Sequence, residues 1–407
     1  MNNKFFKRTI SAFISVFLII SNSAVFAETN DIFVSPSDCI SKSDEIIIEL
    51  EDSPLLSYSE KINTYSTVSD FFSSKEAKEI EQKLEQNRKS VKKSLVQSGM
   101  DFTVKREYST IMNGLAVEAN VADLDAIKQT DGVKDAFVAE FYSLPEPIDT
   151  YSSGGVSAIG GDIVGDLGFT GKNSAVAILD TGLDLSHPAF SSVNSPKYSK
   201  EDIEIVIKNN KMTIGKLNVS KVYINDKIPY AYDYADVDTN VSGGESHGTH
   251  VAGIVGANSG GVVEGVAPDA QLFIMKVFGD SSGGAYDDDI LAALDDSVKF
   301  GVDVINMSLG STAGFSESAY KSMREIYNRV KNSGIALYCA AGNEYSSTYE
   351  NAAGNDLPKA TEPDNGVVAS PSTYEAALSV ASMNNIETTS IYLLSNGRKI
   401  RYNDTAE

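Results

Sequence analysis

The pattern of apolar and polar residues divides the chain into two regions. The first predicts a small domain of strands and helices, and the second predicts strands that alternate with helices. In the first region, strands are predicted at 46–50, 103–108, 112–119 and 133–139. A charged stretch between the first two strands has apolar residues at helical spacing, and a short helix is predicted at 123–129. We expect Ser73, three residues before Glu76, to cap the longer helix and Gly99 to end it. The order β-α-β-β-α-β is typical of a small ferredoxin-like α+β domain.

The second region, from Ser174 onward, predicts an α/β fold. The runs at 175–179 and 272–278 lack regular polar alternation, as do strands that are covered on both faces. The remaining predicted elements are strands at 302–309, 335–341 and 377–383 and helices at 287–301 and 319–334. Strands that alternate with helices predict a mainly parallel sheet with helices on both faces, and such sheets bind ligands at the carboxyl ends of their strands.

Composition narrows the possible functions. The chain has 407 residues, which suggests two or three domains, and a net charge of −22. That charge argues against a general affinity for nucleic acid or an anionic membrane, because both need clustered positive charge. There are two cysteines, Cys39 and Cys339, in separate predicted domains, which excludes a framework of disulfides. Because Cys339 lies within an apolar run, we expect a buried thiol there rather than a nucleophile.

The N-terminus has the pattern of a secretory signal peptide over residues 1–27. Lys4, Lys7 and Arg8 precede an apolar run at 10–20. After this run, Val25 and Ala27 stand at the small-residue positions of a signal-peptidase cleavage site. A membrane anchor is the alternative, but this run is shorter than the roughly 20 apolar residues that a membrane span needs. No later segment is long and apolar enough to span a bilayer either. We therefore expect the protein to be secreted.

The small domain and the segment after it suggest a precursor. Residues 28–143 contain the ferredoxin-like pattern, and residues 144–161 are rich in Pro, Ser and Gly, as an exposed linker is. A secreted small domain before such a linker is either a removable prosegment or an ordinary domain that stays attached.

The first chemical candidate is Asp180-Thr181-Gly182, directly after the strand predicted at 175–179. A carboxylate held at the end of a strand can orient an imidazole and stabilise its cation. The alternative is a simple turn, which Asp and Gly both favour.

The second candidate is the segment from His247 to Gly253, His-Gly-Thr-His-Val-Ala-Gly, which begins an apolar helix. His247 at the start of the helix would face a cleft, as a general base must. We expect His250 to lie one turn deeper and to be structural. A metal site built from the two histidines is the rival interpretation. Zinc usually takes three or four protein ligands, and no Cys or His-Glu-x-x-His pattern supplies them here.

The third candidate is Asn343 in Ala340-Ala341-Gly342-Asn343, which follows another strand. Its carboxamide could donate to a developing oxyanion, although on its own the residue would be assigned to a turn. Ser308-Leu309-Gly310 ends the neighbouring strand, where its backbone could pair with an extended peptide.

Together and in this order, these motifs resemble the subtilisin-like serine proteases, peptidase family S8. Gly265-Val266-Ala267-Pro268 adds to the resemblance, and the segment 227–234 is similar to the lactocepin and C5a-peptidase branch. The resemblance implies that Asp180 orients the imidazole, that His247 is the general base and that Asn343 donates to the oxyanion. It also implies a substrate-binding edge at Ser308-Leu309-Gly310. The small domain resembles the family's inhibitory propeptide, of the inhibitor I9 type.

The family's nucleophile motif, Gly-Thr-Ser-x-Ala, does not occur in these 407 residues. Residues 384–407 resemble the entry to a protease-associated domain that this branch inserts before the nucleophile. We expect the catalytic domain at 162–383 to be an N-terminal part that is nearly inactive by itself. The alternative is a non-catalytic protein that binds peptides or partners through the same cleft.

The resemblance implies protein or peptide substrates, no required cofactor and no protein-bound metal in catalysis. Family members often bind Ca²⁺, for which Asp280 and the run Asp287, Asp288 and Asp289 are candidates by charge. Aspartates at the N-terminus of a helix, where they favour the helix dipole, are the alternative interpretation. Association with the cell wall would be encoded elsewhere.

Overall fold

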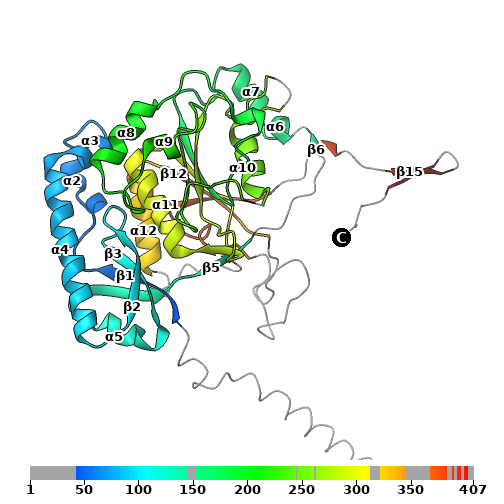
Figure 1. Cartoon of the computed structure of the whole chain (residues 1–407). Helices are drawn as coiled ribbons and strands as arrows, with labels where there is room; N and C mark the ends of the chain where they lie inside the picture. Colours follow the sequence, from blue (N-terminus) through cyan, green and yellow to red (C-terminus); the bar gives the residue numbers. More distant parts are fainter. Residues whose placement is uncertain are drawn as a thin grey trace, which may run out of the picture.

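A computed structural model of the chain is shown in Figure 1. It describes residues 43–144, 152–153, 155–243, 245–260, 263–311, 321–343, 367–382, 387–388, 392–395 and 398–401. The signal peptide predicted at 1–27 and Cys39 lie outside the described residues. Within the described residues, no helix combines the length and the apolar character that crossing a membrane requires.

The N-terminal domain is a four-stranded antiparallel sheet with the strand order β2-β3-β1-β4. Its strands are β1 (Ser43–Leu50), β2 (Phe102–Tyr108), β3 (Gly114–Asn120) and β4 (Val133–Val138). Its main helices are α4 (Lys75–Gln97) and α5 (Leu124–Lys128). Both the order of elements along the chain and the order of strands in the sheet confirm the ferredoxin-like prediction.

The start of α4 differs from the prediction. Ser74 caps the helix, because its Oγ accepts a hydrogen bond from the backbone N–H of Ala77 at 3.1 Å. Ser73 instead ends a separate short helix, α3 (Val68–Ser73), which the sequence patterns did not indicate. On the buried side of α4, Val91 and Leu95 pack in the same apolar cluster as Ile46 and Ile48 of β1.

The larger domain contains a six-stranded parallel sheet with the order β13-β12-β11-β7-β9-β8. In chain order the strands are β7 (Ala175–Asp180), β8 (Tyr230–Asp233), β9 (Gln271–Lys276), β11 (Val304–Met307), β12 (Ala336–Ala340) and β13 (Ala377–Val380). Its main helices are α8 (Lys200–Asn209), α10 (His247–Gly256), α11 (Asp287–Phe300) and α12 (Lys321–Asn332). This arrangement confirms the predicted α/β fold.

The remaining described elements are short. They are η1 (Leu55–Ser57), α2 (Ser59–Ile62), η2 (Val121–Asp123), β5 (Phe141–Ser143), β6 (Ser152–Ser153), α6 (Gly155–Ala158), α7 (Gly161–Asp166), η3 (Pro188–Phe190), α9 (Val219–Val222), β10 (Gly284–Tyr286), β14 (Glu387–Thr388), β15 (Tyr392–Ser395) and β16 (Arg398–Arg401).

Alternate residues of β7 belong to two different apolar cores. Ala175, Ala177 and Leu179 pack in the cluster that includes buried residues of α8, α11 and α12. Val176 and Ile178 pack instead in the cluster that includes residues of α10. Because successive side chains of a strand point to opposite faces, the last residue of β7, Asp180, lies on the α10 face. The sheet thus has helices on both faces, and its strand periodicity directs Asp180 toward α10.

The N-terminal domain packs against α11 and α12 of the larger domain (Figure 1). The backbone N–H groups of Thr110 and Ile111 both donate to Asp295 Oδ1 of α11, at 3.0 and 2.8 Å. Arg329 of α12 donates to the carbonyl oxygen of Ile111 at 2.9 Å. Polar groups on α11 and α12 therefore bind the connection between β2 and β3, and the two domains share one apolar cluster.

Cys339, the free cysteine in the described part of the chain, lies buried in β12. Burial raises the pKa of its thiol to about 12. A thiol in this environment stays protonated at neutral pH, which agrees with the expected structural role.

Candidate active site

A short hydrogen bond joins the two residues that sequence analysis selected as an acid–base pair. His247 Nδ1 lies 2.7 Å from Asp180 Oδ1, and the same oxygen accepts the backbone N–H of Thr181 at 2.7 Å. The Asp180 side chain is almost fully buried, and that of His247 is 10% exposed. A carboxylate bonded to Nδ1 fixes the ring so that Nε2 can act as the base, and it stabilises the imidazolium that forms.

Glycines allow the segments that carry these two residues to meet at backbone distance. Gly182 has φ +113°, and a Cβ there would lie 2.1 Å from the carbonyl oxygen of Val241. A Cβ on Gly248 would lie 2.3 Å from the carbonyl oxygen of Gly182. The backbone N–H of Gly248 donates to Thr181 Oγ1 at 2.9 Å. The segments with the sequences Asp-Thr-Gly and His-Gly-Thr therefore pack at backbone distance only because both carry glycine. Larger residues at these positions would separate the two segments.

The other candidates lie at the same carboxyl edge of the sheet. Asn343 follows β12, after Gly342 in a left-handed conformation with φ +104°. Ser308-Leu309-Gly310 follows β11; Leu309 is buried, and Ser308 Oγ accepts a hydrogen bond from Asn306 at 3.0 Å. The structure thus brings Asp180 and His247 into contact and places Asn343 and 308–310 at the ends of neighbouring strands.

His250 does not lie deeper in the fold, as we had expected, but is exposed. The buried side of α10 consists of small and apolar residues, Gly248, Val251, Ala252 and Gly256. His250 is not one of these buried residues. Its position three residues after His247 therefore does not place it in the core. A structural role in the core is therefore wrong for this residue.

The matching family model is that of the subtilase family, Peptidase_S8, which covers residues 171–403. The chain belongs to the subtilase family. It is 33% identical over 307 residues to the PIII-type proteinase of Lactococcus lactis subsp. cremoris (strain SK11), an alignment that covers 72% of this chain and 15% of that protein. It is 32% identical over 221 residues to a C5a peptidase of Streptococcus pyogenes serotype M3, covering 52% of this chain and 18% of that protein.

The chain therefore spans only a small part of the length of these relatives. Among solved structures, fervidolysin from Fervidobacterium pennivorans matches with a TM-score of 0.49 and 16% identity. That match covers 89% of this chain and 45% of fervidolysin.

Sequence analysis missed a contact at a second strand edge of the subtilase domain. Strand β5, at the end of the N-terminal domain, pairs antiparallel with β10, with Tyr142 opposite Ala285. The buried Tyr142 hydroxyl donates to Asp287 Oδ1 at 3.0 Å. A Cβ on Gly284 would lie 2.5 Å from the backbone carbonyl oxygen of Tyr142, so this contact requires glycine. The consecutive glycines 283 and 284 were the signal in the sequence for a close approach of backbone.

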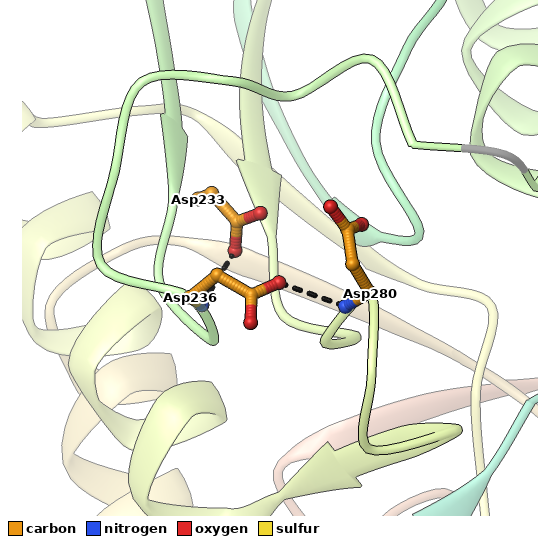
Figure 2. Close-up of side chains that lie close together, drawn as sticks. All are labelled: Asp233, Asp236 and Asp280. Carbon is orange, nitrogen blue, oxygen red and sulfur yellow. Dashed lines mark hydrogen bonds between the residues drawn. The ribbon is translucent and has the colours of Figure 1, made fainter.

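Three carboxylates gather near the same end of the sheet (Figure 2): those of Asp233, Asp236 and Asp280. Each offers an oxygen within 4.8 Å of the others, a spacing that could hold a metal ion. Lys276 forms ion pairs with all three. Burial lowers the pKa of Lys276, but Asp233 and Asp280 more than offset this effect and raise it above its ordinary value.

The calcium candidates thus have other partners in the structure. Asp280 pairs with Lys276, as described above. Asp287 accepts the backbone N–H of Glu140 at 2.8 Å, and Asp289 pairs with Arg106 of the N-terminal domain. Within the described part of the chain, the run Asp287 to Asp289 belongs to no cluster with metal-ligand spacing.

Proposed function

We propose that this chain is the N-terminal part of a secreted, subtilisin-like serine endopeptidase that hydrolyses peptide bonds of proteins. The observation that carries the proposal is the 2.7 Å contact between His247 Nδ1 and Asp180 Oδ1 at the carboxyl edge of the parallel sheet. Membership of the subtilase family, with relatives that are named proteinases, supports the same reaction class.

In the proposed reaction, His247 Nε2 accepts the proton of a serine hydroxyl while the serine oxygen attacks the carbonyl carbon of the scissile bond. Asp180 orients the ring and stabilises its positive charge. Asn343 donates a hydrogen bond to the oxyanion, a contact worth about 3–4 kcal/mol of barrier in such sites. His247 then gives the proton to the leaving amine. These steps need no cofactor, and the Ser308–Gly310 backbone would pair with the extended substrate.

We propose that the nucleophilic serine lies outside this chain, since none of its serines stands in a Gly-Thr-Ser-x-Ala context. An open face of the sheet supports this idea. On the α10 face, Tyr338 of β12 is 39% exposed, and Leu378 and Val380 of β13 are each 51% exposed. Sheets of this class are covered on both faces. A helical segment that follows the nucleophile would cover these residues.

The N-terminal domain would act as an intramolecular inhibitor, with residues 28–143 as the propeptide and 144–161 as the linker. The β5–β10 pairing supports this role, because it shows an extended segment of the N-terminal domain added to a strand edge of the subtilase domain. Residues 384–407 would begin an inserted domain. We also propose that the protein is secreted and that segments outside this chain associate it with the cell wall.

A serine-directed phosphonate probe tests the catalytic assignment. We expect no labelling of the 407-residue chain, and labelling once the chain is extended through the downstream reading frame of its source DNA. In the extended polypeptide, His247→Ala should lower the labelling rate by several orders of magnitude. Labelling of the 407-residue chain would contradict the position of the nucleophile. A downstream frame without Gly-Thr-Ser-x-Ala would favour the non-catalytic, peptide-binding alternative.

A further inference from the structure

Three charged residues lie side by side across adjacent strands at the carboxyl edge of the sheet. Asp180 of β7 is the register partner of Lys276 of β9, and Lys276 is the register partner of Asp233 of β8. Two residues before each of them, Ile178, Ile274 and Ala231 belong to the core on the α10 face. By strand alternation, Asp180, Lys276 and Asp233 point to that same face. Lys276 therefore lies between the Asp180 carboxylate and the carboxylate cluster.

The Lys276 ammonium is the shared partner of this cluster. Nζ lies 2.6 Å from Asp233 Oδ2, 2.9 Å from Asp280 Oδ1 and 3.4 Å from Asp236 Oδ2. The Lys276 and Asp233 side chains are only 2% and 1% exposed, so this pair interacts with little screening by solvent, whereas Asp236 and Asp280 are partly exposed. One buried cation thus offsets part of the repulsion among three carboxylates.

The same carboxylates join three segments of the chain, as Figure 2 shows. Asp233 accepts the backbone N–H of Asp236 at 3.0 Å, and Asp236 accepts the backbone N–H of Asp280 at 2.7 Å. Asp233 ends β8, Asp236 lies in the loop that leads to α10, and Asp280 lies in the loop that leads to β10. The cluster therefore connects the loop that precedes His247 with the loop that leads to β10.

The stem of Lys276 lies against both sides of the acid–base pair. A Cβ on Gly182, in the turn after Asp180, would lie 3.1 Å from Lys276 Cδ. A Cβ on Gly243, in the loop before His247, would lie 3.2 Å from Lys276 Cε. The backbone N–H of Val277 also donates to the carbonyl oxygen of Asp180 at 3.0 Å. Lys276 thus contacts the two segments that must stay together for the hydrogen bond to persist.

We propose that Lys276 is a positioning residue for the Asp180–His247 pair: its ammonium is a built-in counter-ion that holds the loop before His247 against the turn after Asp180. The proposal deepens the proposed function and rests on it for its catalytic meaning. Without the ammonium, Asp236 and Asp280 lose the ion pairs that tie their loops to β9, the loop before α10 moves away, and the imidazole loses its fixed orientation. Lys276 itself does not touch the reacting atoms.

The test uses nuclear magnetic resonance on the full 407-residue chain with ¹⁵N-labelled histidine. The chain has three histidines, so the downfield proton of His247 Nδ1–H is resolvable, and its absence in His247→Gln assigns it. We expect Lys276→Met to reduce the intensity of this signal at least twofold, because exchange with water becomes faster once the hydrogen bond loosens. Lys276→Arg, which keeps the charge, should retain the signal.

Lys299→Met is the matched control. Lys299 is also buried and pairs with two aspartates, Asp295 at 2.6 Å and Asp296 at 2.9 Å, but it lies on α11. We expect this variant to lower the unfolding temperature while leaving the His247 signal unchanged. An unchanged signal in Lys276→Met, or an equal loss in Lys299→Met, would overturn the proposal.

A second variant covers the case in which Lys276→Met fails to fold. Asp236 and Asp280 are partly exposed, so the double change Asp236→Asn and Asp280→Asn leaves the buried Lys276–Asp233 pair in place. We expect a weaker His247 signal in this variant, and full intensity would again overturn the proposal. If the wild-type signal is present but the extended polypeptide reacts with no phosphonate, the proposed function fails while the positioning role of Lys276 stands.

Discussion

Arg106 of β2 and Asp289 of α11 form a 2.8 Å ion pair across the boundary between the two domains. The same guanidinium nitrogen also donates to the backbone carbonyl oxygen of Tyr234, just beyond β8. Arg106 and Asp289 are 6% and 9% exposed, so both charges are largely removed from water. This arginine thus joins the N-terminal domain to both a helix and a sheet end of the subtilase domain.

Arg106→Met should destabilise the chain strongly, because it leaves the buried Asp289 carboxylate without its cation. Breaking a buried pair in this way costs about 3–5 kcal/mol. The measurement is the free energy of unfolding of the full chain in urea. Lys211→Met is the control, since Lys211 crosses the same boundary to Glu85 but is 45% exposed. We expect the control to cost about 1 kcal/mol or less. Equal losses in the two variants would contradict this account.

The contact between the domains should weaken as the pH rises. Burial raises the pKa of Asp287 from 3.8 to about 7, and the nearby Glu140 adds to this effect. The folded chain therefore keeps a proton that the unfolded chain has already lost, so this stabilising contribution falls as the pH rises from about 4 to about 7. Between about pH 5 and pH 8, we expect wild type to lose roughly 2 kcal/mol relative to Asp287→Asn.

Thermal and urea unfolding of both proteins over this pH range measure that difference. Asp287→Asn keeps an oxygen that can accept from the Tyr142 hydroxyl, so the variant should fold. Parallel pH profiles for the two proteins would show that Asp287 does not titrate in this range.

Much of this architecture follows from local patterns. The apolar run of β7 and the helical spacing of α4 and α11 each carry a short-range signal, so the strands, helices and fold class could be predicted. Asp180 and His247 could be selected because each stands behind or at the start of a predictable element, at the edge where ligands of parallel sheets bind. Their pairing was implied by the resemblance to the subtilisin-like proteases.

The missed features depend on partners that are distant in sequence. Lys276 lies in an apolar run and gave no sign of its three carboxylate partners, which come from the end of β8 and from two loops. The β5–β10 pairing joins two domains, and no periodicity encodes it. For the α4 cap, the sequence pattern indicated Ser73, but α3 ends at that residue and Ser74 caps α4 instead.

Gly284→Ala should detach β5 from β10, because the added methyl group would lie 2.5 Å from the backbone carbonyl oxygen of Tyr142. We expect the segment after Tyr142 to become more sensitive to limited proteolysis, with cleavage at least several-fold faster. Gly165→Ala in α7 is the control, since a Cβ there meets nothing within 4 Å. If both variants resist cleavage as well as wild type does, the pairing does not depend on the size of residue 284.

Asp180→Asn should abolish most catalysis in the extended polypeptide while leaving the fold intact. The amide presents an N–H where the carboxylate accepted a hydrogen bond, so the imidazole takes the wrong tautomer. In triads of this type the change lowers kcat by about 10⁴-fold. Hydrolysis of a chromogenic peptide measures the effect, and an unchanged unfolding temperature is the control. A loss below about tenfold would argue that Asp180 does not orient the base.

The alternation of β7 between two cores restricts how this strand can change during evolution. Removing or inserting a single residue ahead of Asp180 would turn its carboxylate into the opposite core, among residues such as Met275 and Met307. It would also exchange every apolar partner of the strand at once. Substitutions in β7 are therefore open to selection one at a time, whereas a change in its length would remove the base's orienting group and the packing together.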